Sequence, residues 1–170
     1  VALLIAAPQP SPAESTTACT HLQPSVVDLM YQSADLGNLE IFGINSDGSG
    51  QVNLTSTPLA NEGYASWSPD GQTNAFDANC GGNIDIYLVD ADGTNLRRLT
   101  LDPNADGIPN WSPDGGRIGF SSTRANGSGD IYIMNADGTN PHRLTTSSPD
   151  ESYGVWSPDG TEIAYIRPQF

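Results

Sequence analysis

Short segments that alternate apolar and polar positions recur along the chain and predict β-strands. Three of them are "TNAFDA" (73–78), "RIGFSS" (117–122) and "TEIAYI" (161–166). Alternation with a period of two is typical of strands with one buried face. No long stretch carries helical periodicity, and Gly, Pro, Ser, Thr and Asn are abundant. The pattern therefore predicts an all-β fold of short strands and many turns.

A repeat of about 45 residues organises these strands. Three segments resemble one another, and each leads into a Trp-centred turn; they are "LEIFGINSDGSGQVNLT" (39–55), "IDIYLVDADGTNLRRLT" (84–100) and "GDIYIMNADGTNPHRLT" (129–145). The turns are "SWSPDG" (66–71), "NWSPDG" (110–115) and "VWSPDG" (155–160), and an earlier strand "VVDLMYQS" (26–33) begins a further copy. This period, with four short strands per unit, indicates propeller blades.

The turn residues within each unit fit this prediction. Asp-Gly pairs stand where a tight reversal needs a positive φ, and Pro presets φ in "WSPDG". Ser and Asp of that motif are expected to satisfy backbone groups of the turn. The tryptophans Trp67, Trp111 and Trp156 are expected to fill space between neighbouring units.

The pairing of "DIYxxxADGTNxxRLT" with "WSPDG" resembles the TolB-type, WD-repeat-like β-propeller repeat family. The resemblance covers about residues 26–166. It implies three to four four-stranded antiparallel blades within a repeat domain at 19–170. Three blades cannot close a ring without severe strain, so we expect an incomplete or open ring with exposed edges. Two alternatives stay open: the sequence is a fragment of a larger propeller, or its sheets stack openly and another chain covers the exposed side. The family includes periplasmic scaffolds and propellers attached to serine peptidases or other enzymes.

Residues 1–18 form a different segment, with an apolar start and a Pro/Ser/Thr-rich tether. We predict that the start inserts as a donor strand into a neighbouring subunit and builds a head-to-tail filament. The assembly residues are Val1, Ala2, Leu3, Leu4, Ile5, Ala6 and Ala7. Two alternatives stay open: the arm completes a sheet of its own domain, or it is the remnant of a signal peptide.

Charge and cysteine content narrow the partners and the compartment. Twenty acidic residues oppose six arginines, for a net charge of −14, so neither nucleic acid nor membrane insertion is expected. The two cysteines, Cys19 and Cys80, are interpreted as one disulfide; the alternative is two unrelated buried thiols. We therefore expect an extracellular or cell-surface location, with the periplasm as second choice.

Calcium is the one ligand that the sequence suggests. In "DPNADG" (102–107), Asp102, Asn104 and Asp106 alternate ahead of a glycine, as in the first half of an EF-hand loop, although the second half does not match. An ordinary Asx-rich loop is the alternative. Glu40, Asp85 and Asp130 recur before three strands and are expected to cap turns or to accept backbone N–H bonds, rather than to form a ligand set.

Candidate glycosylation sites are two sequons and four hydroxyl groups. They are Asn126, Asn53, Ser11, Ser15, Thr16 and Thr17. A third sequon, at Asn110, adjoins a tryptophan that we expect to be buried.

No catalytic motif is recognised, and neither histidine stands near a nucleophile motif, so an enzyme is not expected. Two functional hypotheses follow. The first is a secreted structural subunit that assembles with itself into an extracellular fibril. The alternative is a TolB-like envelope binding module that holds a protein or glycan through its propeller face and its arm.

Overall fold

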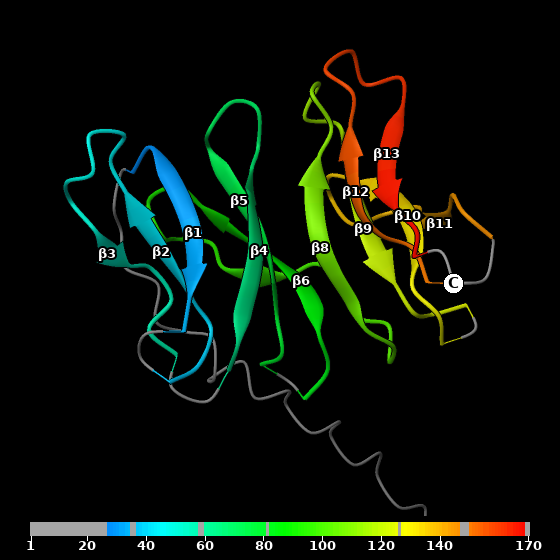
Figure 1. Ribbon diagram of the computed structural model, residues 1–170, viewed down its shortest axis with the longest axis horizontal. Coiled ribbons are helices and arrows are strands. Elements are labelled where there is room, and N and C mark those ends of the chain that lie inside the picture. Colours follow the sequence, from blue (N-terminus) through cyan, green and yellow to red (C-terminus); the bar gives the residue numbers. More distant parts are fainter. Residues whose placement is uncertain are drawn as a thin grey trace, which may run out of the picture.

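The computed structural model describes residues 27–34, 37–57, 60–80, 82–125, 127–146 and 150–168. Within them, the chain forms antiparallel strands grouped in four small sheets (Figure 1). The all-β prediction is confirmed. Nothing in this described part forms a helix with the length and hydrophobicity of a membrane span.

We call the four sheets the first to fourth blades, in chain order. The first blade contains β1 (Leu29–Ser33), β2 (Glu40–Ile44) and β3 (Val52–Asn53). The second contains β4 (Glu62–Trp67), β5 (Thr73–Ala78), β6 (Asp85–Asp90) and β7 (Arg97–Arg98). The third contains β8 (Asp106–Trp111), β9 (Arg117–Ser122), β10 (Asp130–Asn135) and β11 (His142–Arg143). The fourth contains β12 (Ser152–Trp156) and β13 (Ile163–Ile166).

The predicted turns set the register within each blade. Gly93 takes a φ of +79°, which a residue without Cβ adopts readily, and the Asp92 carboxylate accepts hydrogen bonds from the amide and hydroxyl of Thr94. In the "WSPDG" turn of the second blade, the Ser68 hydroxyl donates to Asp70 and accepts from the amide of Thr73. The Ser and Asp side chains therefore satisfy turn groups, as predicted.

The core lies between the blades. One cluster joins the first and second blades through Ile41, Phe76 and Tyr87. A second cluster joins the second and third blades through Ile86 and Phe120. Because successive strand residues point to opposite faces, each complete blade supplies one apolar face to the blade before it and one to the blade after it.

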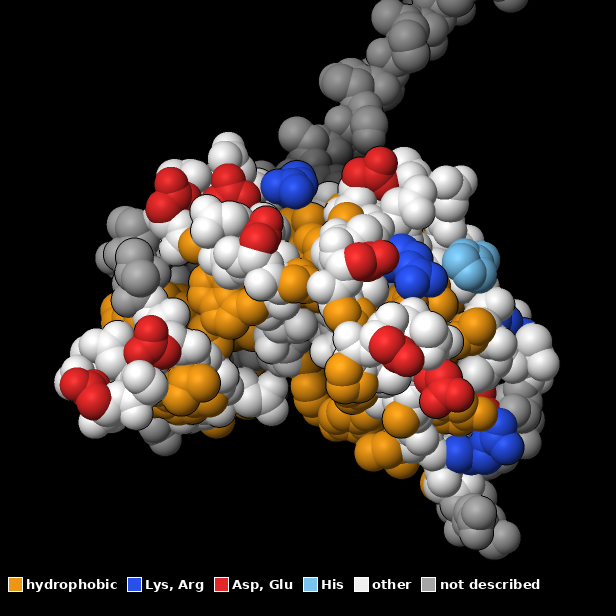
Figure 2. Space-filling view, turned by 90° about the horizontal axis from the view of Figure 1, so that it is seen from above, with side chains coloured by type: hydrophobic (Ala, Val, Ile, Leu, Met, Phe, Trp, Pro, Cys, Tyr) orange, Lys and Arg blue, Asp and Glu red, His pale blue; other side chains and the backbone are white. Residues whose placement is uncertain are grey.

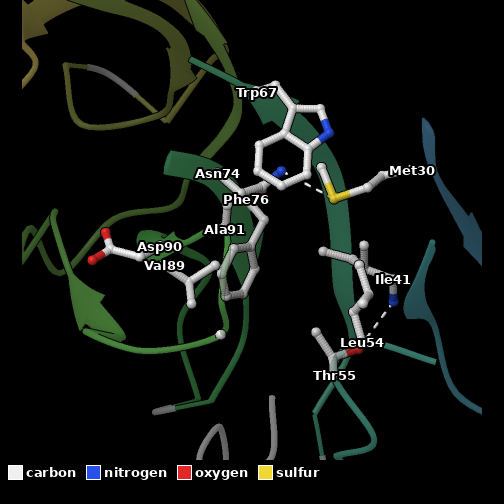
Figure 3. A pocket seen from close by; sticks show the side chains of 11 residues that line it. Met30, Ile41, Leu54, Thr55, Trp67, Asn74, Phe76, Val89, Asp90 and Ala91 are labelled. Carbon is white, nitrogen blue, oxygen red and sulfur yellow. Dashed lines mark hydrogen bonds between the residues drawn. The ribbon is translucent and has the colours of Figure 1, made fainter. Parts of the chain in front are cut away.

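The tryptophans fill these junctions, which confirms their predicted position. Trp67 lines a gap against Met30 of the first blade, and Trp111 packs on the cluster between the second and third blades. Trp156 donates from Nε1 to the carbonyl oxygen of Asn110 at 3.2 Å. The gap at Trp67 is a small, mainly apolar cavity of about 30 Å³ (Figure 3). It has room only for a molecule the size of water, and it is therefore a packing void rather than a ligand pocket.

The blades follow one another in an arc rather than a closed ring, as expected. In Figure 1, β1, β4, β8 and β12 follow one another from left to right, and each of these strands contacts the next. Seen from above, the arc has a notch on the side of these strands (Figure 2). We call this side the concave face. It carries the site described next.

Candidate functional site

Three of the four strands of the concave face carry a β-bulge. In each of β4, β8 and β12, the register with the neighbouring strand shifts within the strand. The bulged residues Tyr64, Ile108 and Tyr153 have φ values of +46°, +56° and +57°. A left-handed φ costs a bulky side chain about 1–3 kcal/mol and persists only when surrounding contacts hold it. Three equivalent residues are thus fixed in one unusual conformation.

Hydrogen bonds between blades hold two of these bulges. The Gln32 side-chain oxygen in the first blade accepts from the amide of Tyr64 at 3.1 Å. The Asp77 carboxylate in the second blade accepts from the amide of Ile108 at 2.6 Å. Gln32 and Asp77 occupy the same register position, each opposite an isoleucine of the next strand. We call this contact the inter-blade latch.

The third blade has a shorter side chain at the latch position. Ser121 pairs with Ile131 in the same register. Its hydroxyl oxygen is buried and has no hydrogen-bond partner within the part of the chain that the structure describes. The latch is therefore unformed on the side of the fourth blade.

Tyr64 and Tyr153 meet at the concave face from two different blades. Their hydroxyl groups lie 2.7 Å apart, and their rings form an edge-to-face pair with centroids 5.5 Å apart. This hydrogen bond, more than partial burial, raises the pKa of Tyr64 to about 12. Tyr64 is 39 % exposed and Tyr153 is 40 % exposed. The pair is thus an aromatic feature, joined by one hydrogen bond and one ring contact, that is accessible to a ligand.

A hollow of about 430 Å³ adjoins the tyrosine pair. Its walls come from the second, third and fourth blades and include Tyr64, Asp77, Ile108, Ser121 and Asp150. The volume lies within the usual range of small-ligand pockets. The hollow combines an aromatic ring with carboxylate and hydroxyl groups.

Asp77 is one of two buried acids that line this hollow; the other, Glu151, pairs with Arg167. Asp77 is 8 % exposed, and burial raises the pKa of its carboxyl group to about 6 despite the hydrogen bond from Ile108. A Cβ atom on Gly107 would lie 2.8 Å from the carboxylate, so only glycine lets β8 approach this closely. None of the ion pairs among the described residues includes Asp77.

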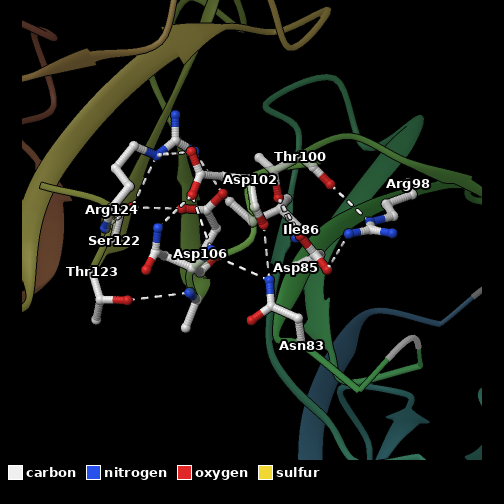
Figure 4. Close-up of polar contacts among 12 residues, drawn as sticks. Asn83, Asp85, Ile86, Arg98, Thr100, Asp102, Asp106, Ser122, Thr123 and Arg124 are labelled. Carbon is white, nitrogen blue, oxygen red and sulfur yellow. Dashed lines mark hydrogen bonds and ion pairs between the residues drawn. The ribbon is translucent and has the colours of Figure 1, made fainter. Parts of the chain in front are cut away.

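Other buried acids of the repeats do pair with arginine (Figure 4). Arg98 lies 2.8 Å from Asp85, and Arg143 lies 2.7 Å from Asp130. Glu151 pairs with Arg167. Glu40 instead accepts hydrogen bonds from the amide of Thr57 and the hydroxyl of Thr55. The repeated acids therefore hold the fold together, and the arginine partners of two of them are a feature that the sequence analysis missed.

The candidate calcium loop is occupied by an arginine. Arg124 donates to Asp106 at 2.6 Å and lies 3.8 Å from Asp102 (Figure 4). Asp106 also accepts from the Ser122 hydroxyl, and Asp102 accepts from the amide and side chain of Asn104. The described residues contain no group of three acidic, His or Cys side chains arranged to hold a metal. The geometry gives the calcium prediction no support and fits the alternative of an Asx-rich loop.

The remaining candidates have mixed outcomes. Cys80 is disulfide-bonded, and its predicted partner Cys19 lies outside the described residues. Asn53 accepts hydrogen bonds from the amides of Thr55 and Ser56, while its side-chain nitrogen is buried, a geometry that does not suit a glycan. The others also lie outside the described residues, namely Val1–Ala7, Ser11, Ser15, Thr16, Thr17 and Asn126. The domain boundary at 18/19 and the fibril prediction depend on that region and stay predictions.

The sequence contained a signal for the concave face. "EGYASW", "DGIPNW" and "ESYGVW" align an acid, a small residue and a bulky residue ahead of each tryptophan. This recurrence marks the bulge position. It does not indicate that Tyr64 and Tyr153 meet.

Comparison with known proteins agrees with this architecture. The family model described as the TolB beta propeller domain matches residues 61–169. No curated protein sequence matches the chain. TolB from Acinetobacter baumannii superimposes with a TM-score of 0.73 and 29% identity, over 82% of this chain and 34% of that protein.

Two further solved structures are similar. A protein described as TolB from Agrobacterium tumefaciens gives a TM-score of 0.70 and 26% identity, over 80% of this chain and 48% of that one. A chain of a nidogen/laminin complex gives a TM-score of 0.66 at 16% identity, over 85% of this chain and 55% of that one, which shows the fold alone. The present chain thus spans between a third and a half of the two TolB proteins. Since the family model covers more than half of the chain and fits its repeats, the chain belongs to the TolB β-propeller family.

Proposed function

We propose that this chain is a non-catalytic binding module of the cell envelope, and that its concave face holds the partner. The observation that carries the proposal is the Tyr64–Tyr153 pair beside the hollow of about 430 Å³. Tyrosine suits binding surfaces because its ring buries a large apolar area while its hydroxyl group keeps a polar partner.

The backbone conformation of the pair supports this role. Both tyrosines sit on bulges with left-handed φ values, and the Gln32 latch holds the Tyr64 bulge. A site that is ordered before binding loses less conformational entropy when the partner arrives. Backbone strain that is retained at an accessible surface is common at functional sites.

The proposed location rests on two further properties. Cys80 is disulfide-bonded, which fits an oxidising compartment such as the periplasm or the cell exterior. The chain belongs to the TolB β-propeller family, and two solved structures that are similar to it are bacterial TolB proteins. The fibril hypothesis, by contrast, depends on residues 1–7, and nothing among the described residues supports it.

Photo-crosslinking tests the proposal. p-Benzoylphenylalanine replaces Tyr153, which keeps an aromatic ring at the site, and the protein is irradiated with an envelope fraction. The matched control carries the same group at Thr94, an exposed residue between β6 and β7. We expect a saturable crosslinked product from position 153. Excess unlabelled protein should reduce it, and the Tyr64→Ala substitution should abolish it. Equal products from both positions would contradict a site on the concave face.

A further inference from the structure

We propose that the hollow beside the tyrosine pair receives the cationic head of a lysine or arginine side chain from a protein partner, with Asp77 as the counter-ion. This inference rests on the proposed function, since it names the chemical group through which the concave face holds its partner. It adds a ligand class and a residue that contacts the ligand.

The first observation that favours a cationic ligand is the environment of Asp77. Its side chain lines the hollow and is 8 % exposed, yet no arginine pairs with it among the described residues. The bond from Ile108 uses one acceptor position of Oδ2. A carboxylate has about four such positions, so most remain available to N–H donors of a ligand.

The chain itself shows how it binds a cation beside a buried acid. The guanidinium group of Arg124 pairs with Asp106 at 2.6 Å and also lies over the rings of Phe120 and Tyr132, at 5.3 and 5.2 Å. The hollow offers the same components, namely the Asp77 carboxylate and the Tyr64 ring, without an internal arginine. Carboxylate and aromatic face together favour a cation, and the attraction grows as water is excluded.

Two other polar groups add to the site. The Ser121 side chain lines the wall, and its buried hydroxyl oxygen has no hydrogen-bond partner among the described residues. Asp150 lies at the rim, where its carboxylate accepts from the amide of Gly129. A second negative charge at the entrance strengthens the preference for a cation.

Charge separates this ligand class from the alternatives. The chain carries a net charge of −14, which repels phosphate and other anions and accelerates encounter with a basic protein surface. A neutral sugar satisfies hydroxyl partners and leaves the buried charge of Asp77 uncompensated. A lysine or arginine head supplies the missing charge, and a hollow of about 430 Å³ has room for it and its stem.

An NMR titration of the ¹⁵N-labelled full chain tests the inference. The probes are N-acetyl-lysine methylamide, the arginine analogue, the norleucine analogue and methyl glucoside. We expect the two cationic probes to shift the amide signals of Ile108 and Tyr64 in a saturable manner. The norleucine analogue has the same stem without the charge, and we expect at least about tenfold weaker binding from it. Equal responses to the lysine and norleucine analogues, or to methyl glucoside, would overturn the inference.

A pair of variants assigns the effect to Asp77. Asp77→Asn keeps an oxygen acceptor for the Ile108 amide and removes the charge. Asp114→Asn removes an equal charge from a turn outside the hollow, between β8 and β9. We expect binding of the lysine probe to weaken at least about tenfold in Asp77→Asn and to stay unchanged in Asp114→Asn. Unchanged binding in Asp77→Asn would overturn the inference. The comparison of probes on the unmodified chain needs no variant to fold.

The two proposals fail separately. If crosslinks at position 153 persist unchanged in Asp77→Asn, the concave face binds a partner and the cationic contact is wrong. If the lysine probe binds through Asp77 and position 153 gives no specific crosslink, the cation site stands and the proposed partner-binding function fails.

Discussion

The hydroxyl groups of Tyr64 and Tyr153 lie 2.7 Å apart although 89 positions separate them in the chain. One belongs to β4 of the second blade and the other to β12 of the fourth, with β8 of the third blade between them. The bond thus ties together two blades that are not consecutive. Because the bond spans the third blade, its presence depends on the curvature of the arc.

Replacing Tyr153 with Phe tests this contact. The change removes the hydrogen bond that raises the pKa of Tyr64 to about 12, so that pKa is expected to fall toward its ordinary value near 10. NMR observation of the Tyr64 ring carbon during a pH titration measures it. Tyr165→Phe, on β13, is the control and should leave the Tyr64 titration unchanged. A Tyr64 pKa that does not move would show that the pair does not form.

Asp77 predicts a pH dependence of stability with a definite sign. Its pKa is about 6 in the folded chain against 3.8 ordinarily, so the folded state binds more protons between these values. The contribution of this group to the free energy of unfolding therefore falls as pH rises from about 4 to above 6, by at most about 3 kcal/mol. Glu62, whose pKa burial raises to about 7, acts in the same direction over a higher range.

Denaturant unfolding of Asp77→Asn beside the unmodified chain isolates this term. The variant is expected to be the more stable protein at pH 7.5 and to lose that advantage at pH 4. Asp114→Asn should show no such gain at pH 7.5, because hydrogen bonds from Ser112 and Gly116 hold the pKa of Asp114 below its ordinary value. A stability difference for Asp77→Asn that is independent of pH would refute the assignment.

Ser121→Gln should build the latch that is missing between the third and fourth blades. Glutamine at this register position copies Gln32, whose oxygen accepts from the Tyr64 amide. The new bond to the amide of Tyr153 is expected to add about 1 kcal/mol and to slow hydrogen exchange at that amide. Gln32→Ala is the converse change and should accelerate exchange at Tyr64. If Ser121→Gln leaves exchange at Tyr153 unaltered, the latch is not transferable between blades.

Arg124→Gln should be among the most damaging changes of a charged residue. It leaves Asp106, a fully buried carboxylate, without its arginine, and such uncompensated burial costs about 3–5 kcal/mol. Arg97→Gln, at an exposed position of β7, is the control and should change stability by less than about 0.5 kcal/mol. Thermal unfolding measures both variants, and similar losses would mean that the ion pair carries little of the stability.

Calcium and a chelator test the loop at 102–107. Arg124 occupies the space between Asp102 and Asp106. We therefore expect neither 5 mM calcium nor EDTA to change the unfolding temperature of the unmodified chain by more than about 1 °C, which corresponds to a small change in stability. A clear rise with calcium would restore the sequence-based interpretation of this loop.

The sequence by itself determined the repeat and most of the local structure. The 45-residue period predicts blades, the Asp-Gly and "WSPDG" turns set the strand ends, and the tryptophans lie at the junctions between blades. These features depend on neighbouring residues or on a regular spacing. For that reason they can be read along the chain.

The tertiary structure decided the site. The contact between Tyr64 and Tyr153, the latch from Asp77 to Ile108 and the seat of Arg124 all depend on which blade faces which, and at what angle. The oxygen-bearing residues of "DPNADG" suit a calcium ion and an arginine side chain equally well. Only the packing shows that an arginine lies there. Spacing in the sequence fixes what each blade is, whereas the arrangement of the blades in space fixes which side chains meet.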